Sequence, residues 1–210
     1  MILDDEATPA MPFTEIVTKR LALRDLQASD ARRIFDYRSR PDVSRFQSWG
    51  SESSEEIGSY IRGLGGTEPG TPGAWYQVGI DLRSSGELIG DCGFRVLEAE
   101  PRQAEFGIAL APEYQFNGYA AEALRALLDY LLFTLAKHRV TGSVDPRNIR
   151  SIRLMQKVGM RQEAHFVRSF WFKGEWVDDM IFAMLASDWK SGKGLRETLI
   201  KFSLSTASIG

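Results

Sequence analysis

Residues 111–137, APEYQFNGYAAEALRALLDYLLFTLAK, decide which fold this sequence predicts. The stretch opens with turn-forming residues around Gly118 and then becomes an unbroken pattern with leucines three and four residues apart. That spacing places the leucines on one buried face of a helix. The leucines are Leu124, Leu127, Leu128, Leu131, Leu132 and Leu135. We therefore expect a glycine-containing loop that leads directly into a buried amphipathic helix.

The beginning of this helix is a candidate anion site. The N–H groups of a first helical turn have no partner within the helix and lie at the positive end of its dipole. Small residues at Gly118 and Ala120 let a phosphate approach the backbone, and Gln115 and Asn117 add uncharged donors. An ordinary turn glycine before an ordinary helix explains the pattern equally well. The loop alone therefore does not decide between the two interpretations.

Two further helices are predicted nearer the N-terminus. Ser29 is the expected N-cap of the first, and Pro41 is expected to end it. Ser53 and Glu56 have the spacing of a capping box for the second helix, and the glycines at 65–66 are expected to close it. A later helix at residues 148–159 has Asn148 as its expected N-cap and Gly159 at its end.

Alternating apolar and polar residues predict seven strands. Short turn-rich connections join the second, third and fourth strands, which implies an antiparallel meander. The long helix between the fourth and fifth strands makes that pair parallel. The last two strands flank a Lys-Gly pair and predict a hairpin. The seven segments are residues 19–26, 74–82, 87–97, 103–110, 139–144, 163–172 and 175–185.

The order of these elements predicts one mixed α/β (α+β) domain over residues 14–190. The flanking segments 1–13 and 191–210 lack periodicity and are expected to be tails. We find no internal repeat and no linker that would divide the chain.

Composition excludes several classes of function. The chain has 210 residues, a formal net charge of −2 and a pI of about 5.8, so no overall basic field exists to hold a nucleic acid. The single cysteine, Cys92, cannot form an internal disulfide, and the acidic N-terminus does not resemble a secretion signal. No apolar run is long enough to span a membrane. His138 and His165 lack metal-ligand spacing. We expect a cytoplasmic protein without a metal, nucleic acid or membrane partner.

Residues 104–160 resemble the GNAT superfamily of N-acetyltransferases, in particular its RimJ/RimL-like branch, which modifies N-terminal amines. Residues 115–120, Gln-Phe-Asn-Gly-Tyr-Ala, match the Gln/Arg-x-x-Gly-x-Gly/Ala loop with which this family holds the pyrophosphate of acetyl-CoA. Three further segments resemble the first strand and helix, the central hairpin and the closing hairpin of that branch. They are TKRLALRDLQASDA (18–31), GELIGDCGF (86–94) and WFKGEWVDDMIFAML (171–185).

The resemblance implies a GNAT fold, in which a central mixed, mostly antiparallel twisted sheet is flanked by helices. The strands at 103–110 and 139–144 would splay into a V-shaped wedge that takes acetyl-CoA as the acetyl donor. Backbone groups of Ile108, Ala109 and Leu110 would pair with the pantetheine arm. The other cofactor-binding residues that the resemblance implies are Gln115, Phe116, Asn117, Gly118, Tyr119, Ala120, Asn148 and Ser151.

In this family the amine attacks the thioester directly. An alkylammonium ion has a pKa of about 10.4, so a group in the site must accept a proton before attack. Glu105 resembles the family's acidic residue on the strand that leads to the cofactor loop, and it is the candidate base, acting directly or through a water molecule. A solvated strand glutamate without a catalytic role is the alternative interpretation.

The thiol that leaves CoA would be protonated or hydrogen-bonded by a residue of the helix at 148–159. Many members of the family carry a tyrosine there, but Met155 occupies the corresponding position. Ser151 resembles the serine that N-terminal amine acetylases of this branch carry, and it is the second candidate catalytic residue. An ordinary helix hydroxyl also explains Ser151, as capping alone explains Asn148.

The acceptor is expected to be an amine, either a protein N-terminus or a small molecule. Tyr114, Trp171 and Trp176 are candidate walls of its pocket, and Asp178 or its neighbour Asp179 is a candidate partner for a cationic amine. Aromatic residues of strands are often core residues instead. The aromatic hairpin is also a candidate surface for a homodimer. Because the usual tyrosine is missing, a non-catalytic acyl-CoA-binding or sensory module with the same fold is the alternative function.

Overall fold

The computed structural model describes residues 13–47, 53–64 and 67–191, and eight strands within these ranges form one sheet. The strand order is β1-β2-β3-β4-β5-β6-β8-β7, and neighbouring strands are antiparallel except β5 and β6, which are parallel. The predicted mixed class and mostly antiparallel sheet are confirmed. The strands are β1 (Ile16–Val17), β2 (Leu21–Asp25), β3 (Trp75–Leu82), β4 (Glu87–Val96), β5 (Gln103–Leu110), β6 (Arg139–Val144), β7 (Arg161–Phe172) and β8 (Glu175–Leu185).

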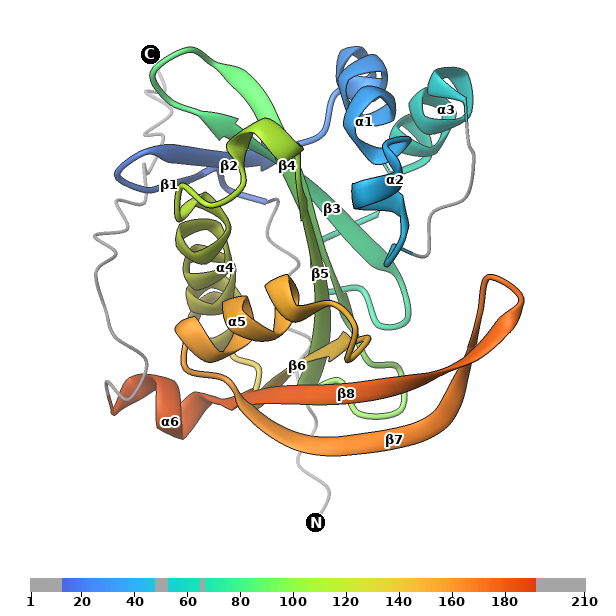
Figure 1. The fold of residues 1–210 in the computed structure, drawn as a ribbon. Coiled ribbons are helices and arrows are strands. Elements are labelled where there is room, and N and C mark those ends of the chain that lie inside the picture. The colour runs from blue at the N-terminus through green and yellow to red at the C-terminus, as the bar shows by residue number, and fades with distance from the viewer. Residues whose placement is uncertain (1–12, 48–52, 65–66, 192–210) are drawn as a thin grey trace, which may run out of the picture.

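Helices lie on both sides of this sheet. In Figure 1, α4 lies to the left of the sheet and α5 in front of it, while α1, α2 and α3 gather at the upper right. The larger cluster of buried side chains joins the sheet to α4 and α5, and the smaller one joins it to α1 and α3. The helices are α1 (Ala31–Arg38), α2 (Pro41–Ser44), α3 (Ser54–Leu64), α4 (Tyr119–Asp129), α5 (Ile149–Lys157) and α6 (Ala186–Lys190), with a π-helical turn (Tyr130–Thr134) after α4 and 3-10 turns at Ala28–Asp30 and Pro112–Tyr114.

The predicted leucine face packs into the core along α4 and the π-helical turn that follows it. Leu124, Leu127, Leu128, Leu131 and Leu132 are each at most 2% exposed. Burial of one leucine side chain contributes about 1.5–3 kcal/mol, so this helix is held firmly against the sheet. The first turn of α4 is therefore fixed relative to the strands that it faces.

The parallel strands β5 and β6 separate soon after they begin. They pair at three positions, the last of which joins Glu105 to Thr141. Beyond this pair β5 continues to Leu110 and β6 to Val144, with no pairing between them, while β5 stays paired with β4 as far as Gly90. The V-shaped wedge predicted for these two strands is confirmed. One backbone edge of β5 is left open along the wedge.

The predicted cap of the first helix is wrong. Ser29 lies inside the 3-10 turn that precedes α1, and the Asp30 carboxylate instead accepts the backbone N–H of Gln27 at 2.8 Å. Asp30 also accepts a hydrogen bond from Arg24 at 2.7 Å. The 3-10 turn runs directly into α1, so Ser29 already has a turn conformation, and no described side chain caps the first N–H groups of α1.

The capping box of the second helix is confirmed. The hydroxyl of Ser53 accepts the N–H of Glu56 at 3.2 Å, and the Glu56 carboxylate accepts the N–H of Ser53 at 2.6 Å. The glycines at 65–66, expected to close this helix, lie outside the described residues. Pro41 does more than end the preceding helix, because it also begins α2, where its fixed φ suits the first helical position.

The short elements β1, α2 and α6 contain too few residues for periodicity to reveal them. In α6, Trp189 is 1% exposed and its indole N–H donates to Asp129 at 2.6 Å, which fixes the end of the sheet to α4. Of the predicted N-terminal tail only Phe13 is described. Its ring packs against Tyr76 and Tyr130, with ring centroids 5.7 and 5.1 Å apart.

Candidate functional site

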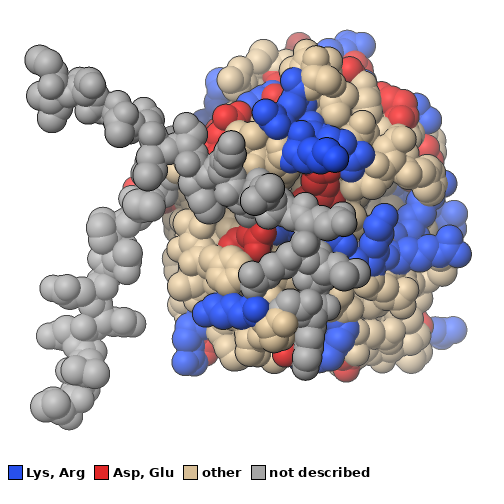
Figure 2. Space-filling view, turned by 90° about the vertical axis from the view of Figure 1, so that its left-hand side faces the viewer, with Lys and Arg blue, Asp and Glu red and all other residues tan. Residues whose placement is uncertain are grey.

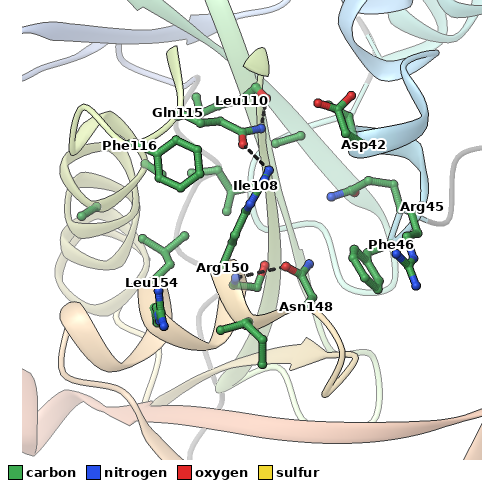
Figure 3. Close-up of a pocket in the computed structure, with 18 of the residues that line it drawn as sticks. Asp42, Arg45, Phe46, Ile108, Leu110, Gln115, Phe116, Asn148, Arg150 and Leu154 are labelled. Atoms are coloured by element: carbon green, nitrogen blue, oxygen red, sulfur yellow. Dashed lines mark hydrogen bonds between the residues drawn. The ribbon is translucent and has the colours of Figure 1, made fainter. Parts of the chain in front are cut away.

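A cavity of about 630 Å³ lies where β5 and β6 separate. Its walls come from segments far apart in the sequence: the end of β5, the loop and first turn of α4, the start and outer face of α5, and the segment at α2. Figure 3 shows side chains of α5 and of the loop before α4 pointing into the cavity from below and from the left. Asp42, Arg45 and Phe46 face them from the right.

The turn before α4 uses backbone conformations that few side chains tolerate. Gly118 is the N-cap of α4 with φ = 80°, and Phe116 has φ = 65°. A Cβ atom added to Gly118 would lie 3.5 Å from a guanidinium nitrogen of Arg20, which is an ordinary contact. Glycine is therefore needed here because it tolerates a left-handed backbone. The sequence alone had suggested its small size as the reason.

The first turn of α4 presents backbone donors to the cavity. Tyr119, Ala120 and Ala121 have no acceptor for their N–H groups within the helix, and no described side chain caps them. Gly118, Ala120 and Ala121 line the cavity. The helix dipole adds a partial positive charge at the same place. An anion that enters here meets donors that are fixed in position and lack partners.

A partly buried network holds this turn against the residues that precede β2. Arg20 contacts the Glu122 carboxylate at 2.7 Å and donates to the carbonyl of Asn117 at 2.9 Å, and its guanidinium lies 4.4 Å from the centre of the Tyr119 ring. Thr18 donates to Glu122 at 2.6 Å. Burial alone would raise the pKa of Glu122, but the hydrogen bonds from Thr18 and Arg20 lower it. The acidic residue of the first turn is thus engaged with β2 and its preceding turn.

The side chains expected to add uncharged donors are engaged with the protein itself. Gln115 donates to the carbonyl of Leu110 at 3.0 Å and accepts from Arg150 at 3.0 Å, and the Asn117 amide donates to the carbonyl of Gln115 at 3.0 Å. Arg150 also lies 5.0 Å from the centre of the Phe116 ring. Figure 3 shows the Arg150 side chain reaching from α5 to Gln115 across the cavity. Both amides therefore shape the loop.

Only alternate residues of β5 direct their backbone N–H and C=O groups toward the open edge. The carbonyl of Leu110 accepts from Gln115, so it points into the wedge, and strand geometry gives Ile108 the same direction. The carbonyl of Ala109 points the other way, because a Cβ atom added to Gly90 of β4 would lie 2.3 Å from it. Ile108 and Leu110 can therefore offer backbone groups to a ligand in the wedge, and Ala109 contributes to the cavity wall.

The start of α5 brings Asn148 and Ser151 to the inner end of the cavity. The Asn148 side chain accepts the N–H of Ser151 at 3.2 Å, so the predicted cap is confirmed. Met155, at the position of the family's usual tyrosine, is 4% exposed and belongs to the core. A Cβ atom added to Gly142 would lie 3.0 Å from its methyl group. Ser151 is therefore the α5 hydroxyl that borders the cavity.

The cavity carries far more positive than negative charge, although the whole chain has a net charge of −2. Figure 2 shows a different face of the molecule, on which Lys and Arg gather near the top and along the right-hand edge with Asp and Glu among them. In the described part of the chain, the only acidic residue that lines the cavity is Asp42, which contacts Arg40 at 3.2 Å. The basic lining residues are Arg45, Arg147, Arg150, Arg153 and Lys157.

One of these cations is already neutralised. Arg147 contacts Asp145 at 2.6 Å and Glu175 at 2.9 Å. Its hydrogen bonds to these two carboxylates raise the pKa of Arg147. Burial alone would raise the pKa of Asp145, but its bonds with Arg147 lower it. Arg147 therefore links the loop before α5 to the start of β8.

A second cavity, of about 170 Å³, lies on the opposite face of the sheet. It shares Gln47, Ile108 and Ala109 with the first cavity, so the two meet at the open part of β5. Gly93 and Gly107 line it: no atom lies within 4 Å of a Cβ atom added to Gly107, whereas the side chain of Gln77 lies over Gly93. Its other lining residues are Arg38, Tyr60, Trp75, Gln77 and Asp91.

Glu105 lies on the same face of β5 as the second cavity. Residues two apart on a strand share a face and are about 7 Å apart, and Gly107 lines that cavity. The Glu105 carboxylate contacts Arg95 at 2.5 Å, and Arg95 lies 5.4 Å from the centre of the Trp75 ring. Glu105 is also the last β5 residue paired with β6. It therefore stands at the apex of the wedge, on the face of the second cavity, although it lines neither cavity.

Sequence reasoning missed Asp91, which is 2% exposed and lines the second cavity. Its carboxylate accepts hydrogen bonds from Tyr37 and Arg38 of α1. Burial, and then the charge of Asp91, raise the pKa of Tyr37. The available signal was a charged residue inside the otherwise apolar run ELIGDCGF. Asp91 fixes α1 to the sheet and is a second carboxylate near the open part of β5.

The aromatic residues expected to form an acceptor pocket lie elsewhere. Tyr114 donates to Glu87 at 2.5 Å, and this hydrogen bond raises its pKa. Trp171 and Trp176 are each 57% exposed near the tip of the β7–β8 hairpin, with ring centroids 5.4 Å apart. None of the three lines either cavity.

The two aspartates of β8 are also occupied by neighbours. Asp178 accepts the N–H of Arg168 at 2.9 Å and contacts His165 at 2.8 Å, and these two hydrogen bonds lower the pKa of Asp178. Asp179 accepts from Ser143 at 2.6 Å. Neither lines either cavity. Among the described residues, Glu105 and Asp91 are the carboxylates closest to the meeting point of the two cavities in strand register.

Within the described ranges, no three His, Cys, Asp or Glu side chains form a group that could hold a metal ion. The helices of the same ranges are all too short or too polar to cross a membrane.

Comparison with known proteins places these features in a wider group. The family model described as "Acetyltransferase (GNAT) domain" matches residues 20–161. The "Uncharacterized N-acetyltransferase YnaD" of Bacillus subtilis is 31% identical and aligns over 83% of this chain and 98% of its own. The "[Ribosomal protein uS5]-alanine N-acetyltransferase" of Escherichia coli is 26% identical over 87% and 96%. The crystal structure of an acetyltransferase (GNAT family) from Bacillus anthracis superposes with a TM-score of 0.74 and 27% identity, covering 82% of this chain and 99% of that one.

Proposed function

This chain belongs to the GNAT acetyltransferase family, and on that premise we propose that it transfers an acetyl group from acetyl-CoA to a primary amine by direct attack of the amine on the thioester. The observation that carries this function is the meeting of the two cavities at Ile108 and Ala109. A donor in the larger cavity and an acceptor in the smaller one would reach the same point on β5 from opposite faces of the sheet.

The larger cavity fits CoA in charge and in donors. The first turn of α4 offers N–H groups of residues 119–121 for a diphosphate, and five basic side chains surround them. The backbone groups of Ile108 and Leu110 face the wedge, where an extended pantetheine amide chain can pair as an added strand. The diphosphate and the pantetheine amides of CoA would therefore both have hydrogen-bonding partners in the cavity.

The reaction forms one C–N bond and breaks one C–S bond. The amine lone pair attacks the thioester carbonyl carbon, the sulfur leaves with the C–S electron pair, and the nitrogen loses a proton. A backbone N–H of β5 at the wedge would donate to the carbonyl oxygen as it gains negative charge. The products are an acetylated amine and the CoA thiol.

We assign the proton-accepting role to Glu105, directly or through a water molecule. It lies at the apex of the wedge on the face of the second cavity, where Arg95 contacts one oxygen of its carboxylate and its side chain is 30% exposed. Asp91 is 2% exposed, and Tyr37 and Arg38 of α1 donate hydrogen bonds to both of its carboxylate oxygens. It is therefore assigned to positioning α1 rather than to catalysis.

We assign Ser151 to the leaving sulfur. Its N–H is capped by Asn148, which leaves the hydroxyl available at the inner end of the cavity. A hydrogen bond from this hydroxyl would stabilise the thiolate, so the missing family tyrosine is not required. Asn148 would then both cap α5 and border the pantetheine arm.

The acceptor is proposed to be an amine at the end of a peptide or a small molecule, as in the RimJ/RimL-like branch. The Escherichia coli relative is named for an alanine of ribosomal protein uS5. The smaller cavity, of about 170 Å³, has room for the end of such a molecule rather than for all of it. The reactive end would lie over Gly107, where no atom lies within 4 Å of an added Cβ atom, and beside the Gln77 side chain, which covers Gly93.

Incubation with acetyl-CoA and a panel of amines tests this function. The panel contains polyamines, aminoglycosides, amino acids and peptides with free N-termini, and thiol release is measured together with product mass. At least one amine is expected to gain an acetyl group at a rate that depends on the protein. Binding of acetyl-CoA without acetylation of any amine would instead support the non-catalytic acyl-CoA-binding module.

Two variants of Ala120 test the anion site directly. In Ala120→Glu a carboxylate replaces a methyl group at the cavity, and binding of CoA in calorimetry is expected to be lost because like charges repel. An acidic residue in a first helical turn favours the helix, so the protein stays folded. Ala120→Gln has nearly the same bulk without the charge and is expected to lose less affinity. Native affinity in Ala120→Glu would refute the assignment.

A further inference from the structure

The outer part of α5 carries a row of cations that the reaction does not use. Arg150, Arg153 and Lys157 are three and four residues apart, so they project from one side of the helix. All three are exposed and line the larger cavity. Within the described ranges, neither Arg153 nor Lys157 makes a side-chain hydrogen bond or ion pair. Their charges are therefore available to a ligand.

This row runs from the reacting end of the cavity outward. Asn148 and Ser151 mark the inner end, and a helix rises about 1.5 Å per residue, so Lys157 stands about 9 Å farther along the axis than Ser151. Arg150 is already directed at Gln115 and the ring of Phe116, next to the first turn of α4 (Figure 3). Arg153 and Lys157 lie beyond it.

CoA carries its negative charge at two separate places. The diphosphate joins the pantetheine arm to the adenosine, and a phosphomonoester on the 3′-hydroxyl of the ribose lies on the far side of it. With the arm in the wedge and the diphosphate at the first turn of α4, the ribose must extend outward along α5. Resting on the proposed function, we infer that Arg153 and Lys157 form the subsite for the 3′-phosphate, so that this protein distinguishes CoA from dephospho-CoA.

The other cations of the cavity are less suited to this role. Arg147 is neutralised by Asp145 and Glu175. Arg45 lies on the opposite wall, 5.1 Å from the centre of the Phe46 ring. A phosphomonoester carries about −1.5 to −2 charges at neutral pH and forms its strongest hydrogen bonds with Arg and Lys that are not already paired. Arg153 and Lys157 meet that condition.

Calorimetric binding of CoA and dephospho-CoA to the native protein gives the first test. The two ligands differ only in the 3′-phosphate, and CoA is expected to bind at least about tenfold more tightly. In Arg153→Gln and in Lys157→Gln the affinity for CoA is expected to fall severalfold, while the affinity for dephospho-CoA stays nearly native. The ratio of the two dissociation constants should approach one in the double variant.

Two controls separate this subsite from general attraction. Arg147→Gln makes the same change in net charge in the same cavity, and it is expected to leave the ratio unchanged because its side chain is already paired. Arg150→Gln should weaken both ligands equally, because both contain the diphosphate. Glutamine is a good helix former, so exposed positions of α5 tolerate it, and thermal denaturation confirms that each variant is folded.

Equal affinity of the native protein for the two ligands would overturn the subsite, even if both bind tightly and the enzyme is active. A ratio that falls as much in Arg147→Gln as in Arg153→Gln would also overturn it, since the effect would then be one of net charge. Failure to bind either ligand would refute the proposed function itself, so the two failures are distinguishable.

Discussion

The wedge depends on a glycine that faces it from the neighbouring strand. Gly90 of β4 is paired with Leu110, and a Cβ atom added to it would lie 2.3 Å from the carbonyl oxygen of Ala109 and 2.5 Å from a methyl group of Leu110. The first of these is more than 1 Å inside the ~3.5 Å of an ordinary contact. It involves backbone, which no rotamer change can move. Gly90→Ala must therefore displace β5 at the residues where the two cavities meet.

Overpacking of this kind costs about 1–3 kcal/mol. For a chain of this length each kcal/mol lowers Tm by about 2–4 °C, so Gly90→Ala is expected to lower Tm by about 2–12 °C. A displacement of about 1 Å at the reacting groups lowers the rate of an enzyme by about 10²-fold. The affinity for CoA should fall as well, because the same shift moves the open edge of β5.

Gly107→Ala is the matched control, since it adds the same methyl group to the strand that Gly90→Ala would displace. No atom lies within 4 Å of the added Cβ, so Tm should stay native or rise slightly. Its methyl group projects on the side of the second cavity, so KM for the amine should rise while CoA affinity is kept. Circular dichroism, calorimetry with CoA and the thiol-release assay measure the three quantities. A native Tm and native CoA affinity in Gly90→Ala, or equal losses in both variants, would refute the reasoning.

Three other changes have definite expected outcomes. Asn148→Ala removes the cap of α5, which costs about 0.5–2 kcal/mol and should appear as a lower Tm in thermal denaturation. Ser151→Ala keeps the capped N–H and hence Tm, but the loss of one hydrogen bond to the leaving sulfur should lower kcat about tenfold in the thiol-release assay. Burial of Glu122 opposes its ionisation, but the hydrogen bonds from Thr18 and Arg20 outweigh burial and lower the pKa of Glu122. The unfolded state therefore binds more protons than the folded state, and stability rises with pH. That stabilisation is complete above the ordinary glutamate pKa of about 4.3 and is lost as pH falls through the lowered value, so the Tm values of native and Glu122→Gln protein should converge in acid.

The parts of the fold that the sequence predicts are those in which one local pattern determines the structure. The leucine spacing of α4 and the capping box at Ser53 depend on neighbours within a few residues, and both are confirmed. The parallel pair of β5 and β6 follows from the helix that connects them. The prediction for Ser29 failed because a 3-10 turn at Ala28–Asp30 precedes α1 and runs into it, so the helical conformation begins before Ser29.

The cofactor side of the candidate site could be predicted more fully than the acceptor side for the same reason. The first turn of α4 is a local feature, and its glycine is visible in the sequence, although the structure gives the backbone conformation rather than bulk as the reason for it. The second cavity instead combines side chains of α1, α3 and three strands. Trp171 and Trp176 were predicted to line the acceptor pocket because they are aromatic, yet they lie near the tip of the β7–β8 hairpin.

Glu105 connects the two halves of the site and shows what position adds to residue type. Its carboxylate is ordinary in the sequence, since exposed glutamates are common on strands. In the structure it is the last residue of β5 that pairs with β6, and it projects to the face on which Gly107 leaves room for the proposed acceptor. A base placed before the strands separate can reach the nitrogen without entering the wedge, where it would compete with the thioester for space. On the proposed function, the separation of β5 from β6 would both admit the acyl donor and determine where on β5 a base can act.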